Sequence, residues 1–144
     1  MPSVRAAPKF NEQNIVTVTM SYDASIVYDP SFYDGTNHSA QVGDAVALVG
    51  NGTVGLGAAG GALFGKLLAV EPDGVCTVAI AGMLQFPAAT TNPPLLGHGV
   101  TVDGAGKVSS AATAVDAEAG SLVVHPSYTA DDGSTVAVVA LARN

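Results

Sequence analysis

The chain has 144 residues, which is enough for one domain and too few for two ordinary ones. Its 48% hydrophobic and 12% charged residues exclude wholesale disorder, which needs few apolar groups and many charges. The net charge of −7 disfavours nucleic acid as a partner, because phosphate binding rests on clustered Lys and Arg. No stretch approaches the ~20 apolar residues of a membrane helix, and the N-terminus shows no secretory signal, so no membrane partner is expected either.

The N-terminal part of the chain differs in composition from the rest. Residues 1–40 hold most of the tyrosines, and we predict an extended N-terminal arm there, ahead of a β-rich domain over residues 41–144. Within the arm, residues 15–20 alternate apolar and hydroxyl side chains, as a half-buried strand does. Two interpretations stay open: the arm wraps its own barrel, or it docks on another subunit as an added strand or strap.

Further along the chain, short apolar runs alternate with turn signals. The predicted strands, in order, are residues 45–49, 75–81, 100–102, 122–124 and 135–141. Gly-containing turns are predicted at residues 51–52, 73–74, 103–106 and 131–133. Residues 86–94 carry three prolines and are predicted to form a loop, while residues 110–119 favour a short helix or a loop equally. The expected fold is mainly β, a single small barrel or sandwich with little helix.

A Gly-rich stretch looks like a nucleotide-binding motif. Residues 50–55 and 55–60 both match G-x-G-x-x-G, which in dinucleotide-binding folds opens a helix under a pyrophosphate. Here the helix would contain five glycines, and no carboxylate follows the next strand to bind the ribose. The stretch therefore favours a hairpin with tight turns. A nucleotide-binding enzyme that uses residues 50–60 is the less favoured alternative.

No catalytic constellation is present in the sequence. His38, His98 and His125 lie far apart, and none has a His or Cys three or four residues away, as zinc sites usually do. Cys76 lies in the apolar run 75–80 and is interpreted as a small core residue. We therefore expect no metal, no cofactor and no enzymatic activity.

The order of segments resembles a known family. Residues 40–46, 65–70 and 75–82, then a Pro-rich loop, residues 99–108 and a terminal run at 136–141 resemble the head decoration (cement) proteins of tailed bacteriophages. The resemblance implies a non-enzymatic protein, made in the host cytoplasm, that binds the major capsid protein on the outer surface of the assembled head. It also implies a homotrimer that clamps neighbouring coat subunits against internal pressure.

Under this resemblance, contact residues can be proposed. The expected contacts with the capsid or a neighbouring subunit are Val4, Phe10, Ile15, Val16, Tyr28, Phe32 and Tyr33, with packing in the chain's own core as the alternative. The expected trimer contacts are Phe86, Pro87, Pro93, Pro94 and Leu95, since a rigid Pro loop loses little entropy on docking. The rival function is a tail-associated or carbohydrate-binding β module, but a chain without tryptophan has little with which to build an aromatic platform.

Overall fold

The fold consists of strands joined by turns and loops. The computed structural model describes residues 13–32, 38–111 and 120–142, and within them no residue is helical. The strands are β1 (Gln13–Tyr22), β2 (Ala45–Gly50), β3 (Thr53–Gly55), β4 (Gly65–Val70), β5 (Val75–Pro87), β6 (Val100–Val102), β7 (Val108–Ser110), β8 (Ser121–Thr129) and β9 (Thr135–Leu141). The predicted mainly β fold is confirmed.

The first five strands close into a small barrel. They follow one another in the order β1-β3-β2-β4-β5, and β5 pairs back onto β1 to complete the ring. All neighbouring pairs are antiparallel except β1–β3, which is parallel. Closure of this kind leaves few exposed sheet edges, which suits a protein whose strands are short. Of the two predicted architectures, barrel and sandwich, the structure shows the barrel.

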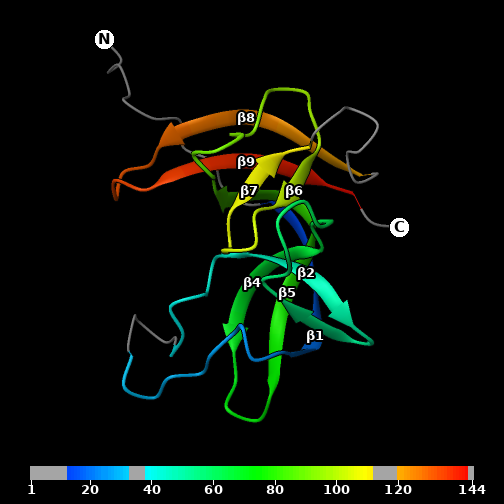
Figure 1. Cartoon of the computed structure of the whole chain (residues 1–144), viewed down its shortest axis with the longest axis vertical. Coiled ribbons are helices and arrows are strands. Elements are labelled where there is room, and N and C mark those ends of the chain that lie inside the picture. The colour runs from blue at the N-terminus through cyan, green and yellow to red at the C-terminus, as the bar shows by residue number, and fades with distance from the viewer. Residues whose placement is uncertain (1–12, 33–37, 112–119, 143–144) are drawn as a thin grey trace.

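Strand β5 extends the same seven-stranded sheet beyond the barrel, and we call the part formed by β5, β9 and β8 the arched sheet. Its first half pairs with β4, and its second half, Gly82–Pro87, pairs with β9, which in turn pairs with β8. The change of partner occurs at Gly82, whose φ of +121° is a conformation that side-chain-bearing residues rarely adopt. Figure 1 shows β8 and β9 arching over the end of the barrel, with the short β6–β7 hairpin beneath them.

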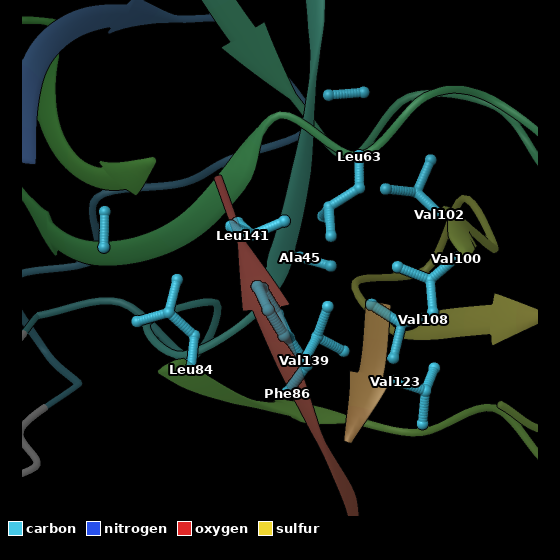
Figure 2. Packing of buried hydrophobic residues seen from close by; sticks show 12 residues of the cluster. Ala45, Leu63, Leu84, Phe86, Val100, Val102, Val108, Val123, Val139 and Leu141 are labelled. Carbon is cyan, nitrogen blue, oxygen red and sulfur yellow. The ribbon is translucent and has the colours of Figure 1, made fainter. Parts of the chain in front are cut away.

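Two clusters of buried side chains make up the core. The first lies within the barrel and includes Ile26, Val46, Val54, Leu67, Val70, Cys76 and Val78. The second joins the arched sheet, the β6–β7 hairpin and β2, with Phe86 and Val139 near its centre (Figure 2). The interpretation of Cys76 as a core residue is confirmed, since its side chain is 1% exposed.

Part of the segment predicted as an N-terminal arm lies in the barrel. Residues 13–22 form a barrel strand that pairs with β3 and β5, and Ile26 lies in the barrel core. For these residues the structure agrees with the strand predicted at residues 15–20 and with the alternative in which the segment packs on its own barrel. Residues 1–12 and 33–37 lie outside the described residues, as do residues 112–119 of the alternative short helix, whose first residue, Ser110, instead ends β7.

The turn predictions are confirmed. Asn51 and Gly52 connect β2 to β3, Gly74 lies between β4 and β5, residues 103–106 connect β6 to β7, and Gly133 lies between β8 and β9. Each of these turns contains a glycine with positive φ, between +61° and +92°. This explains why glycine appears so often in a chain with so little room for helices.

Candidate interaction surfaces

Large aliphatic side chains remain exposed on the folded chain. Among the described residues they are Ile15, Val16, Val27, Leu48, Val49, Leu95, Leu96 and Leu122, each between 38% and 65% exposed. Apart from Val27 they gather on β1, on β2, and around the loop that precedes β6 and the start of β8. Grouped apolar exposure marks contact sites more often than single exposed residues do.

The β1 surface contains two of the predicted contacts. Ile15 and Val16 are 38% and 51% exposed, whereas Val18 and Met20 pack against the barrel core. The outer end of β1 thus presents aliphatic side chains on a paired strand. Val4, Phe10 and Tyr33, which were predicted to share this role, lie outside the described residues.

The predicted aromatic anchors are partly engaged in their own subunit. Tyr28 packs against the barrel core, and its ring lies 5.6 Å from that of His38. His38 Nδ1 also hydrogen-bonds the Phe32 carbonyl oxygen at 2.7 Å. Hydrogen bonds from the Ser31 hydroxyl and N–H to the Asp29 carboxylate lower the pKa of Asp29. These contacts fix the segment on the barrel and leave Tyr28 and Phe32 half-buried.

The predicted trimer contacts fall into two groups. Phe86 is fully buried in the second core cluster and Pro94 is also buried, so neither offers its side chain to another subunit. The sequence misled here because the three prolines that follow Phe86 suggested a loop, whereas β5 continues through Pro87. Pro93 and Leu95 are exposed, and Pro87 is half-buried at the end of β5.

The loop around Leu95 is attached to the edge of the arched sheet. The N–H of Gly97 donates to the Val123 carbonyl at 2.9 Å, and the Val123 N–H donates to the His98 carbonyl at 2.8 Å. This attachment brings the loop alongside β8, where Leu122 is 47% exposed. We define the leucine patch as Leu95, Leu96 and Leu122. Leu96 and Leu122 were not predicted as contacts, because neither lies in a distinctive motif.

A polar groove adjoins the leucine patch. It encloses about 1180 Å³ between the loop of residues 89–95 and the β6–β7 hairpin. Its lining includes Pro93 and Leu95 together with hydroxyl, amide and charged side chains from Thr90, Thr91, Asn92, His98, Asp103, Lys107, Ser109 and Ser110. Asn92 has a φ of +52°, which asparagine tolerates better than most residues. No sequence motif marked this groove, since its walls come from separate segments.

A half-buried carboxylate lies where the barrel meets the hairpin. The Ala45 N–H donates to the Gly106 carbonyl at 2.8 Å, and the Asp44 side chain lies against Gly106, where a Cβ would overlap the carboxylate. Burial, followed by the negative charge of Asp103, raises the pKa of Asp44 to about 7, and Lys107 opposes this effect. Asp44 is therefore a titratable group within the junction.

In the described part of the chain, no group of three or more His, Cys, Asp or Glu side chains gathers to hold a metal ion. Burial raises the pKa of Cys76.

Residues 50–55 form the antiparallel β2–β3 hairpin, which confirms the prediction of a Gly-rich hairpin at the nucleotide-like motif. Over the same described ranges, no helix is long and apolar enough to span a membrane.

No protein-family model matches the chain, and no curated protein sequence matches it.

Proposed function

We propose that the chain is a non-enzymatic decoration protein of a tailed-phage head. In this role it binds the major capsid protein on the outer surface of the assembled head as a homotrimer, and it stabilises the shell against internal pressure. The observation that carries the proposal is the leucine patch, which presents three half-exposed leucines near Pro93 at the edge of the arched sheet. The order of segments in the sequence, which resembles that of decoration proteins, supports the same function.

The charge and shape of the chain suit this role. A net charge of −7 keeps the free protein soluble until a symmetric shell presents its sites. Modest apolar contacts then become sufficient when symmetry repeats them on each copy. We assign Pro93, Leu95, Leu96 and Leu122 to the contact between subunits, and Ile15 and Val16 to the capsid or a neighbouring subunit.

Co-sedimentation with assembled heads tests the proposal. The intact chain should saturate the heads of the phage that encodes it, and decorated heads should resist a higher temperature than bare heads. Leu96→Asp should lower the affinity of the chain for heads about tenfold or more, because it places a charge in an apolar contact. Val27→Asp, at a side chain of 50% exposure outside the patch, is the matched control and should bind as the intact chain does.

Three outcomes would overturn the proposal. If none of the chain co-sediments with intact heads, the capsid is not its partner. Sedimentation with isolated tails instead of heads would favour the tail-associated module. A rise of several degrees in melting temperature with NAD or ATP would favour the nucleotide-binding alternative, since a ligand stabilises the state that binds it.

A further inference from the structure

A second apolar surface lies at the distal half of β2. Strand β4 pairs with β2 only at Ala45 and Val46, and β2 then continues to Gly50 with β3 on its other side. Beyond the end of that pairing lies a groove of about 430 Å³. Its lining consists of Ala47, Leu48, Val49, Gly57, Ala58, Gly61, Ala62, Leu63 and Phe64. Leu48 and Val49 are 54% and 42% exposed, so the groove is apolar and open.

The backbone of β2 is oriented toward this groove. The N–H of Phe64 donates to the carbonyl of Val46 at 2.8 Å, on the side of β2 that faces β4. Since every second residue of a strand directs its N–H and C=O to the same side, those of Leu48 point the same way. The groove therefore combines apolar walls with backbone groups at a sheet edge, which is the combination that binds an added strand.

The N-terminal sequence has the pattern of such a strand. From residue 2 to residue 11, even positions are all apolar: Pro2, Val4, Ala6, Pro8 and Phe10. Odd positions are polar or charged except for one alanine: Ser3, Arg5, Ala7, Lys9 and Asn11. In an extended strand the even side chains share one face. Pro2 and Pro8 both lack a backbone N–H, and in an extended strand these two positions face the same edge. The backbone groups along the opposite edge of the strand therefore remain able to pair.

Charge favours binding of this segment to another copy. Residues 1–12 carry two basic side chains and one acidic side chain, which is a net charge of +1. Because the whole chain has a net charge of −7, the remaining residues have a net charge of −8. Two whole chains repel each other, whereas the segment and the body of a second chain attract. Twelve extended residues reach about 40 Å, more than the radius of a body of this size.

We propose that residues 2–11 of one copy bind as an added strand along β2 of a second copy, with the even-numbered side chains in the groove beside Leu48 and Val49. The contact forms between copies of the chain in solution, so it does not depend on the capsid. On a head, it would link neighbouring copies and increase their avidity.

The mass of the full chain in solution tests the site. Sedimentation equilibrium should show an oligomer for the intact chain, and Val49→Asp should weaken self-association about tenfold or more. Val27→Asp is the matched control, because it places the same charge at a similarly exposed valine outside the groove. Unchanged melting temperatures would show that both variants fold. A monomeric intact chain, or equal association of the two variants, would overturn the proposal.

Disulfide cross-linking tests the occupant. Val4→Cys mixed with Val49→Cys should give a disulfide-linked dimer on oxidation, while the native Cys76 is buried and stays unreactive. Arg5→Cys, which belongs to the opposite face of the segment, should cross-link to Val49→Cys several-fold more slowly. Equal rates would exclude an ordered strand. If a chain that carries both Val4→Cys and Val49→Cys forms only an intramolecular disulfide, binding of the segment to a second copy is excluded. Neither result would bear on binding to heads.

Discussion

Replacement of Asp44 by asparagine should stabilise the protein at neutral and alkaline pH but not in acid. The pKa of Asp44 in the folded chain is raised to about 7, whereas an unfolded aspartate titrates near 3.9. Between these two values the folded state binds more protons than the unfolded state, so ionisation of Asp44 lowers stability as pH rises. Asp44→Asn removes the charge and keeps the size of the side chain, so it removes this loss.

The expected size of the effect follows from burial. For a fully buried group, the difference between the ordinary pKa and about 7 corresponds to about 4 kcal/mol. Asp44 is only half-buried, and water screens its charge, so we expect a gain of about 1–2 kcal/mol. The gain should be absent below about pH 4, grow between pH 4 and 7, and stay constant above pH 7.

Urea unfolding of the two proteins from pH 4 to pH 8 measures this gain directly. A gain of this size also corresponds to a rise in melting temperature of roughly 3–8 °C at pH 8. The same free-energy difference at every pH would refute the reasoning, because the effect would then not come from titration of Asp44. A loss of stability at pH 8 would refute it as well, since the carboxylate would then be held by favourable contacts.

Three further predictions concern packing and backbone conformation. Gly106→Ala should lower the free energy of unfolding by about 2 kcal/mol more than Gly133→Ala, because both glycines have positive φ but only Gly106 contacts the Asp44 carboxylate; equal losses in urea would contradict this. Phe86→Ala should cost about 3–5 kcal/mol, whereas Leu95→Ala should change the unfolding midpoint little; a tolerated Phe86→Ala would restore its role as a surface contact. Cys76 should react with a thiol reagent only after unfolding, since its side chain is 1% exposed; rapid reaction of the native chain, followed by absorbance, would show that the barrel opens.

Local patterns in the sequence predicted much of the fold. The terminal strand was predicted at its observed bounds, Thr135–Leu141, because a continuous apolar run between polar turns has few alternatives. The β6–β7 hairpin was predicted from Asp103 and the glycines after it, and Asp103 does accept hydrogen bonds from the N–H groups of Ala105 and Lys107. Where neighbouring residues determine the structure, the sequence was sufficient.

Long-range packing set the limit of prediction. The apolar run at residues 45–49 predicted a strand, but it did not show that β4 pairs with only its first two residues and leaves Leu48 and Val49 exposed. The contact between Asp44 and Gly106 joins two distant turns, and no local pattern marks it. Of the predicted contacts, Ile15, Val16, Pro93 and Leu95 are at the surface, whereas Phe86 is not, because its exposure depends on where β5 ends.

The continuity of β5 has a mechanical consequence. One unbroken backbone belongs to both the barrel and the arched sheet, so the two cannot separate by the opening of an interface between them. A pull on β9 is carried across its whole ladder with β5 and then along that strand into the ring of β1 and β4. Hinge motion between the barrel and the arched sheet would have to bend β5 at Gly82. Unfolding of either part would remove the strand that β5 contributes to the other.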